Sequence, residues 1–310
     1  MIYRHLIAIE ESSSNPIICG VIVTYNPDLT ALEDLIKAIR PQLTHLVIVD
    51  NGSANAFDKW LASSYPDVEL ELLESNLGIA KAQNVGIIRC QKHAPQYFLL
   101  LDQDSVPASN MVSKLVDAIE DKQKSGVKVA SAGPRYFDRR QGNALPFIET
   151  RGLTLHRCTC SAVDDVVDVD YLIASGCLIP LTAIEEVGLM QEDLFIDYVD
   201  IEWGLRAQQK GFQSLGVCAA FMEHQLGDNP INFLGRNIPV HSPLRHYYHF
   251  RNAIWLYRQP WLRNNWKIVD AMRLIRKLVF YSSVTHPRFE HFKMMILGIW
   301  HGATGRMGRK

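Results

Sequence analysis

Residues 17–24, IICGVIVT, form an unbroken apolar run that stops at Tyr25-Asn26-Pro27. An apolar run of this length, closed by turn-forming residues, is typical of a strand that is buried on both faces of a sheet. Outward from this run, apolar positions at helical spacing over 29–43 lead to a second buried run, LVIVD, at 46–50. The alternation continues with helical patterns near 55–64, 79–92 and 111–123 and with strand patterns at 68–74, 97–102 and 128–134. Because crossover helices return successive strands in the same direction, it predicts an α/β fold with a mostly parallel central sheet and helices on both faces.

Polar residues follow each of the first four predicted strands at the point where the strand ends. In parallel sheets of this kind, ligands bind beyond the carboxyl ends of the strands. The polar groups are Thr24-Tyr25-Asn26, Asp50-Asn51-Gly52-Ser53, Asn76-Leu77-Gly78 and Asp102-Gln103-Asp104. Each group alone would also suit an ordinary turn. Their recurrence at successive strand ends predicts that they converge on one edge of the sheet and form a binding site there.

The loop after the first strand argues against two common nucleotide-binding classes. A dinucleotide site needs Gly-x-Gly after that strand and a phosphate loop needs Gly-Lys-Ser/Thr, and the sequence contains neither. Asp102 and Asp104 flank one residue directly after the apolar run YFLLL. Carboxylate oxygens are hard ligands that suit Mg²⁺ or Mn²⁺, and such ions complete their coordination with substrate phosphates. The pair therefore indicates a metal–diphosphate site, and the alternative is a strand-end turn with two solvated acids.

A second acidic segment, LFIDYVDIEWGLRAQQKG at 194–211, places Asp197, Asp200 and Glu202 around the start of a predicted helix. One of these acids could serve as a general base that activates a hydroxyl nucleophile. The alternative is that they only interact favourably with the positive end of the helix dipole. Arg206 lies four residues after Glu202, at the spacing of an ion pair along a helix.

The formal net charge of −1 conceals two oppositely charged regions. Residues 1–229 hold 18 Lys or Arg against 31 Asp or Glu, which gives −13, whereas residues 230–310 hold 14 against two, which gives +12. The basic region interleaves cations with aromatic residues and contains the segment WKIVDAMRLIRKLVFY at 266–281. Its apolar positions at helical spacing are Ile268, Val269, Met272, Ile275 and Val279.

A basic amphipathic helix of this kind suits an anionic membrane surface. The alternative is a helical subdomain that packs the apolar stripe on the rest of the protein. RNA binding is disfavoured, because no nucleic-acid motif accompanies the basic and aromatic residues.

The remaining composition predicts a cytoplasmic protein. No run of 18 or more apolar residues occurs, and Glu10 and Glu11 stand where a signal peptide would be apolar. The six cysteines are scattered, which indicates no disulfide framework. Cys158-Thr159-Cys160 follows His156, but a zinc site is disfavoured because no second cysteine pair stands at the required spacing.

Eight segments, in order, resemble the inverting family 2 glycosyltransferases, which have the GT-A fold. The segments that carry the family resemblance are VIVTYNP (21–27), VDNGS (49–53), NLGIAKAQNVGI (76–87), LLLDQDS (99–105) and DYVDIEWGLR (197–206). Within the family, the chain is most similar to bacterial rhamnosyltransferases of surface-polysaccharide synthesis. The segments that carry this narrower resemblance are IASGCLIP (173–180), EHQLGD (223–228) and HSPLRHYYHFRNAIWL (241–256). The resemblance covers roughly residues 17–260.

The resemblance implies a GT-A catalytic domain over residues 1–240. Its nucleotide-binding half would cover about 17–134 and its acceptor half about 135–240. A basic, aromatic-rich helical extension would follow over 241–310.

The resemblance also implies roles for individual residues. The nucleotide-binding positions are Thr24, Tyr25, Asn26, Asp50, Asn51, Asn76, Lys81, Asn84 and Asp102. The metal-binding positions are Asp104, Asp102 and His224, although His224 could instead be a partly buried histidine with ordinary partners. Asp200 matches the catalytic base, but Val199 stands where the family often has Glu, which leaves Asp197 as a rival base. The donor or acceptor positions are Gly176, Glu202, Trp203, Arg206, Tyr247, Arg251 and Asn252.

The activity that the resemblance implies is a metal-dependent, inverting transfer of L-rhamnose from dTDP-β-L-rhamnose to a lipid-linked or oligosaccharide acceptor in O-antigen synthesis. The cofactor would be Mg²⁺ or Mn²⁺. The enzyme would be a peripheral protein at the inner face of the cytoplasmic membrane, with no nucleic-acid partner. Another donor such as a UDP-hexose stays open, and so does a nucleotidyltransferase reaction. A third alternative is a membrane- or carbohydrate-binding protein on a degenerate scaffold.

Overall fold

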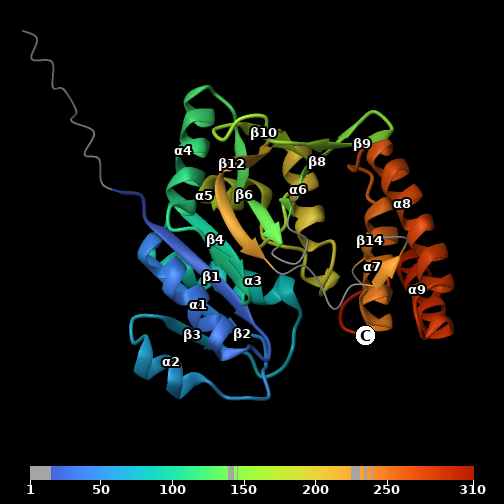
Figure 1. Ribbon diagram of the computed structural model, residues 1–310, viewed down its shortest axis with the longest axis horizontal. Coiled ribbons are helices and arrows are strands. Elements are labelled where there is room, and N and C mark those ends of the chain that lie inside the picture. The colour runs from blue at the N-terminus through green and yellow to red at the C-terminus, as the bar shows by residue number, and fades with distance from the viewer. Residues whose placement is uncertain (1–14, 139–142, 145, 225–230, 234–235, 239) are drawn as a thin grey trace, which may run out of the picture.

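The computed structural model describes residues 15–138, 143–144, 146–224, 231–233, 236–238 and 240–310. Figure 1 shows a twisted central sheet with helices on both faces and a group of C-terminal helices beside it. The sheet and its helices hold the residues that the sequence singles out at the strand ends.

The four strands of the N-terminal half pair in parallel, in the order β3-β2-β1-β4. Their bounds are β1 (Ile18–Thr24), β2 (His45–Asp50), β3 (Glu69–Leu72) and β4 (Tyr97–Asp102). The register sets Thr24 opposite Asp50, and Val23 opposite Asp102. The carboxyl ends of these strands are therefore level with one another, which confirms the predicted strands and brings their polar ends to one edge.

The other half of the sheet mixes strand directions. Its strands are β5 (Ser105–Pro107), β6 (Val129–Asp138), β7 (Asn143–Ala144), β10 (Val166–Val169), β11 (Cys177–Pro180) and β12 (Gln213–His224). β11 lies between β4 and β6 and is antiparallel to both, whereas β12 runs parallel to β6. β10 and β5 pair antiparallel with β12, and β7 pairs antiparallel with β6. The sheet is therefore mixed: β1 to β4 are parallel as predicted, whereas most pairings in this half are antiparallel. The antiparallel β11 is not predicted by the sequence, because four apolar residues carry no signal of direction.

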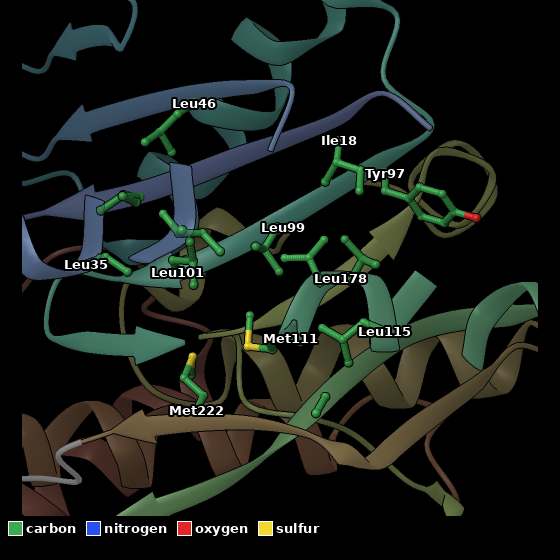
Figure 2. Close-up of a cluster of buried hydrophobic side chains, with 14 of the residues drawn as sticks. Ile18, Leu35, Leu46, Tyr97, Leu99, Leu101, Met111, Leu115, Leu178 and Met222 are labelled. Carbon is green, nitrogen blue, oxygen red and sulfur yellow. The ribbon is translucent and has the colours of Figure 1, made fainter. Parts of the chain in front are cut away.

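Three helices cover each face of the sheet. One face holds α1 (Leu29–Ile39), α2 (Asp58–Ser64) and α4 (Met111–Lys124), and the other holds α3 (Ile79–Cys90), α5 (Leu181–Val187) and α6 (Val199–Gln209). In the first layer, Leu35 of α1 and Leu115 of α4 belong to one buried cluster with Leu99 and Leu101 of β4 (Figure 2). The continuous apolar runs of the strands are thus explained by burial on both faces.

Short elements join these helices and strands. They are the 3-10 turns η1 (Arg40–Gln42), η2 (Gln91–His93) and η3 (Glu192–Leu194) and the hairpins β8 (Phe147–Arg151)–β9 (Thr154–Cys158) and β13 (Ile231–Phe233)–β14 (Arg236–Ile238). α1 ends at Ile39 rather than at residue 43, because Pro41 has no backbone N–H for the helical ladder and the chain tightens into η1.

The C-terminal region forms α7 (Pro243–Tyr257), α8 (Asn264–Ser283) and α9 (Arg288–Thr304). α9 packs closely on α7 at two glycines, Gly298 and Gly302. A Cβ at either position would collide with a backbone carbonyl oxygen of α7, that of Tyr247 or of Arg251, so only glycine allows this approach. Buried residues of these helices form one cluster with Tyr198 and Leu205 at and within α6. The C-terminal helices therefore pack on the helical layer of the central sheet.

α8 leaves exposed most of the apolar stripe that the sequence marks, which argues against the alternative that this stripe packs on the rest of the protein. Of the predicted stripe, Val269 is buried, whereas Ile268, Met272, Ile275 and Val279 are 48%, 40%, 61% and 62% exposed. The buried side of α8 instead carries Trp266, Val269, Asp270, Leu274 and Tyr281. α9 adds a second row of exposed residues, Phe289, Phe292, Ile296 and Trp300. Within the described part of the chain, no helix is both long enough and apolar enough to cross a bilayer.

Two disulfide bonds correct the expectation that the cysteines are unpaired. Cys19 in β1 is bonded to Cys90 in α3, and Cys160 is bonded to Cys218 in β12. Cys158 is free, so Cys158 and Cys160 do not form a zinc-binding pair.

Candidate active site

Asp50 organises the loop at the end of β2. Its carboxylate accepts hydrogen bonds from the Thr24 hydroxyl (2.9 Å), from the Ser53 backbone N–H (2.9 Å) and from the Ser53 hydroxyl. Thr24 is fully buried and Asp50 is 5% exposed, so these donors replace the water that the carboxylate loses. The ends of β1 and β2 are thereby locked together.

Tyr25 and Asn26 extend this arrangement to the neighbouring loops. The Tyr25 backbone N–H donates to Gln103 Oε1 (2.8 Å), which ties the end of β1 to the turn after β4. Asn26 has a left-handed backbone (φ 48°), and its Oδ1 accepts from the Ala54 N–H (2.9 Å). Tyr25 is 47% exposed at this edge, so its aromatic ring is available for a nucleotide base to stack on.

Asn51 and Asn76 join the loops that follow β2 and β3. Asn51 Nδ2 donates to Asn76 Oδ1 (3.1 Å), and Asn51 Oδ1 accepts from the Leu77 N–H (2.9 Å). Asn76 Oδ1 also accepts from the Gly78 N–H (3.0 Å). The predicted convergence of the strand-end groups is confirmed in the geometry of these loops.

Asp102 and Asp104 stand at the turn between β4 and β5. The Asp102 N–H donates to Ser175 Oγ (3.0 Å), and Ser175 also contacts the Ser105 hydroxyl (2.8 Å). The sheet register pairs Ser105 with His224 of β12, which places the backbone of His224 beside this turn. The carboxylates match the ligand preferences of Mg²⁺ or Mn²⁺, ions that also bind a diphosphate.

The side chain of His224 lies outside the described residues, so its role as a ligand stays a prediction. Among the side chains that are described, no group of three or more His, Cys, Asp and Glu residues is arranged to hold a metal alone. Asp102 and Asp104 could therefore supply part of a coordination shell that substrate phosphates complete.

Lys81 and Asn84 connect α3 to η3. Lys81 Nζ lies 3.0 Å from the Glu192 carboxylate, and Asn84 Nδ2 donates to Glu192 Oε1 (2.9 Å) and to the Met190 carbonyl (2.9 Å). Asn84 Oδ1 accepts from the Met190 N–H (2.9 Å), and the side chain is only 2% exposed. In this structure Asn84 supports the η3 segment, while Lys81 is accessible, and a direct contact of either with a nucleotide stays a prediction.

Asp200 lies in the first turn of α6 and is partly buried. Burial raises its pKa to about 6, and the neighbouring Asp197 and Asp102 carboxylates act in the same direction. The Ile201 N–H donates to Asp200 Oδ1 (2.9 Å), which opposes the shift in pKa. A carboxylate with this pKa can accept a proton near neutral pH, as a general base requires.

Asp197 has a different environment. Its carboxylate pairs with Arg245 of α7, with Nε 3.3 Å from Oδ1. This ion pair engages the Asp197 carboxylate with a side chain of α7. The geometry therefore favours Asp200 over its rival as the base.

The segment before α6 is held in an unusual backbone conformation. Phe195, Asp197 and Tyr198 have φ values of 65°, 62° and 64°, the left-handed region that non-glycine residues seldom adopt. Asn252 Nδ2 contacts the carbonyl oxygens of Leu194, Ile196 and Asp197 at 2.8–2.9 Å. Arg251 Nη2 donates to the carbonyl oxygens of Asp193 (3.1 Å) and Leu194 (2.9 Å). Such strained conformations persist only where surrounding contacts fix them.

Arg251 and Asn252 have a structural role in this segment, and a contact of either with donor or acceptor stays a prediction. Both side chains are 0% exposed and contact backbone carbonyl groups of the protein. They fix the segment that carries Asp197 and leads into Asp200. Tyr247, on the same helix, hydrogen-bonds to His301 Nδ1 (2.7 Å) and belongs to the packing between α7 and α9.

The other predicted donor or acceptor positions also have structural partners. Glu202 and Arg206 form a two-pronged ion pair (2.7 and 2.9 Å), which confirms the pairing that their spacing allowed. Trp203 is buried and its Nε1 donates to the Gly188 carbonyl (2.8 Å). Gly176 adopts φ 74°, and a Cβ there would meet Pro134 and Met222. Direct contact of these residues with substrate stays a prediction.

Three residues at the site were missed in the sequence. Ser175 precedes Gly176 in the segment IASGCLIP, and this Ser-Gly pair between apolar residues is the signal that the sequence offers. Arg245 follows the helix-start pattern Ser242-Pro243, and Ser242 does cap α7, but nothing in the sequence pairs it with Asp197. Gln103 sits between the two aspartates and received no role.

Residues 19–171 match the family model described as Glycosyl transferase family 2. The dTDP-rhamnosyl transferase RfbF of Shigella flexneri is 34% identical over 305 residues, which cover 95% of this chain and 98% of the relative. The chain belongs to glycosyltransferase family 2. It is therefore a glycosyltransferase, and the strand-end groups described above lie within or close to the matched domain.

Solved structures support the fold assignment. The crystal structure of GalNAc-T7 with UDP, GalNAc and Mn²⁺ has a TM-score of 0.57 and 16% identity, covering 94% of this chain and 57% of that chain. The structure of Staphylococcus aureus TarS 1-349 has a TM-score of 0.59 and 12% identity, covering 94% of this chain and 82% of that chain. At these identities the likeness concerns the fold alone, and it confirms the GT-A architecture.

Proposed function

We propose that this glycosyltransferase transfers L-rhamnose from dTDP-β-L-rhamnose to a lipid-linked or oligosaccharide acceptor in bacterial O-antigen synthesis, with inversion at the anomeric carbon. The observation that carries the donor assignment is the 34% identity to a dTDP-rhamnosyl transferase across nearly the full length of both chains. The strand-end site supports nucleotide binding, and Asp200 supports direct displacement.

In this proposal the loops after β1, β2 and β3 form the nucleotide pocket. Asp50 and the Asn51–Asn76 pair fix the loop shapes, and the exposed Tyr25 ring faces the base. Asp104 and Asp102, with His224, would hold Mg²⁺ or Mn²⁺. When bound, the ion stabilises the negative charge that develops on the departing nucleoside diphosphate.

Asp200 provides the proton acceptor. Its carboxylate, with a pKa of about 6, is mostly ionised at neutral pH and removes the proton from the acceptor hydroxyl. The hydroxyl oxygen then forms a bond to the anomeric carbon as the bond to the diphosphate breaks. Direct displacement converts the β-linked donor into an α-L-rhamnoside, and no covalent enzyme intermediate is formed.

We further propose that the protein associates peripherally with the inner face of the cytoplasmic membrane through α8 and α9. Exposed apolar residues that are scattered singly are normal on a protein surface, whereas α8 and α9 each carry a row of them. Arg276, Arg288 and Lys293 are exposed on the same two helices. Apolar residues flanked by cations are the features of an interfacial helix on an anionic leaflet.

A donor screen tests the proposed function. Purified protein is incubated with dTDP-rhamnose, UDP-glucose or UDP-galactose and Mn²⁺, and both transfer and hydrolysis are measured. We expect dTDP-rhamnose to be consumed fastest, with release of dTDP. Preference for a UDP-hexose would contradict the donor assignment, and release of inorganic pyrophosphate would indicate a nucleotidyltransferase instead.

A further inference from the structure

Residues 305–310 form a strap that runs from the end of α9 back to the catalytic sheet. Gly305 ends α9 in the left-handed conformation (φ 74°), and Met307 packs against the core cluster on the α3 side of the sheet. The Gly308 N–H donates to the Asp193 carbonyl (2.9 Å), and its carbonyl accepts from Arg251 Nη1. Figure 1 marks the C-terminus beside α7 rather than at the outer end of α9.

The end of the strap is fixed as well. The Lys310 N–H donates to the Tyr248 hydroxyl (2.8 Å), and Lys310 Nζ lies 5.0 Å from the centre of the Tyr247 ring. The strap therefore has anchors at residues 307, 308 and 310. The intervening Arg309 is held in a defined place.

Arg309 reaches the edge of the sheet where the nucleotide loops converge. Its Nη1 donates to the backbone carbonyl of Asn76 (3.1 Å), in the loop after β3. The Asn76 side chain is the one that joins this loop to Asn51. The Arg309 side chain is exposed, and this described hydrogen bond is to a neutral carbonyl rather than to a carboxylate.

Acidic side chains predominate at this edge of the sheet, so an anionic ligand needs a cationic side chain that can turn toward it. The acids near the site include Asp50, Asp102, Asp104 and Asp200, which repel a diphosphate. The nearby Lys81 and Arg245 are paired with Glu192 and Asp197. An arginine fork binds phosphate oxygens through two parallel hydrogen bonds, which is stronger than a bond to a neutral carbonyl.

Building on the proposed function, we propose that Arg309 binds the diphosphate of the nucleotide-sugar donor, so that the strap at 305–310 completes the donor site. The side chain exchanges the Asn76 carbonyl for phosphate oxygens when the donor enters. Arg306 lies on the same strap and is also exposed, and it provides a matched control.

Isothermal calorimetry tests this role with the full chain and Mn²⁺. The ligands are dTDP and thymidine, and thymidine binding is measured by displacement of dTDP. The variants are Arg309→Ala, Arg309→Lys and Arg306→Ala. We expect Arg309→Ala to weaken dTDP binding by about 10- to 100-fold, the range of a hydrogen bond to a charged group, and to leave thymidine binding unchanged. Arg309→Lys should fall between the wild type and Arg309→Ala, and Arg306→Ala should match the wild type.

Equal dTDP affinity in the wild type and in Arg309→Ala would overturn the inference. So would an equal loss of dTDP and thymidine binding, because the strap would then be only a structural tether. The donor assignment is tested separately by rhamnosyl transfer in the wild type. If the wild type binds dTDP through Arg309 but transfers no rhamnose, the donor assignment fails and the role of Arg309 stands.

Discussion

The strand-end loops and the C-terminal helices use charged residues in opposite ways. Residues 1–229 carry a formal charge of −13, and the acids of the proposed donor site, such as Asp50 and Asp102, lie at the carboxyl edge of the sheet. Residues 230–310 carry +12, yet Arg251 is fully buried and directed at the backbone of the acidic region. The basic region therefore has an inner face that holds the backbone of residues 193–197 and an outer face that is apolar and cationic. The net charge of the chain reveals neither task.

Among the changes to the acidic strand-end loops, removal of the metal should lower the transfer rate the most. We expect Asp104→Asn, or chelation by EDTA, to lower transfer by about 10³-fold, because several kcal/mol of leaving-group stabilisation is lost. The assay is the initial rate of dTDP release. Asp168→Asn is the control, since Asp168 is an exposed strand residue paired with Lys122. Unchanged activity in EDTA would contradict metal dependence.

The inner face of the basic region should affect catalysis through geometry. Asn252→Ala removes the contacts to three carbonyl groups, so the segment 194–197 relaxes and the site loses its alignment. We expect kcat to fall by about 10- to 100-fold, with dTDP affinity unchanged. The acidic limb of the pH profile should also shift, because the distance from Asp197 helps to set the pKa of Asp200.

Asn264→Ala, at the exposed start of α8, is the control for this variant. A parallel loss of nucleotide affinity, kcat and thermal stability in Asn252→Ala would mean that the residue supports only the fold.

The raised pKa of Asp200 should also appear in stability. Its native pKa of about 6 lies above the ordinary 3.8, so the native state binds the proton more tightly than the unfolded state does. The contribution of Asp200 to stability should therefore decrease as pH rises from about 4 to about 6 and then level off. Asp200→Asn should be more stable than the wild type at pH 8 by about 3 kcal/mol, and the difference should vanish below pH 4.

Urea unfolding across this pH range measures the difference. Asp197→Asn should behave in the opposite way and lose stability at pH 8, because it loses its pairing with Arg245. A less stable Asp200→Asn at pH 8 would show that the carboxylate is not in an unfavourable environment.

The outer face of the basic region should give the smallest of these effects. Replacing Ile275 or Val279 with Asp puts a charge into the exposed row of α8. We expect each variant to bind anionic phosphatidylglycerol vesicles about tenfold more weakly, the loss expected for one apolar side chain. Ile88→Asp, exposed on α3, is the control. If the variants and the wild type sediment equally with the vesicles, the exposed row of α8 is not a membrane-binding surface.

The sequence predicts those parts of the fold and of the site for which a single local pattern is sufficient. Buried runs such as 17–24 fix strands, and the polar residues that stop them must meet because parallel strands end at one edge. β11 was missed because its four residues carry no direction. In α8 the periodicity correctly marked an apolar stripe, but periodicity does not say which side of a helix finds a partner.

The roles of Arg251 and Asn252 could not be predicted for a related reason. Polar residues in a sequence suggest exposure or ligand binding, and burial requires a set of partners from elsewhere in the fold. Those partners are carbonyl groups turned inward by positive-φ residues at 195–198, a segment without glycine that gives no sign of a left-handed backbone. Arg309 was missed because its position depends on where the strap returns.

Rhamnosyl transfer by the wild type, Asp200→Asn and Asp197→Asn tests the central claim most directly. The donor is dTDP-β-L-rhamnose, the rate is followed from pH 5 to 8, and NMR gives the configuration of the new linkage. The account predicts an α-L-rhamnoside, a wild-type rate that rises through about pH 6, and a loss of about 10³-fold in Asp200→Asn but not in Asp197→Asn. A β-linked product, or full activity in Asp200→Asn, would contradict it.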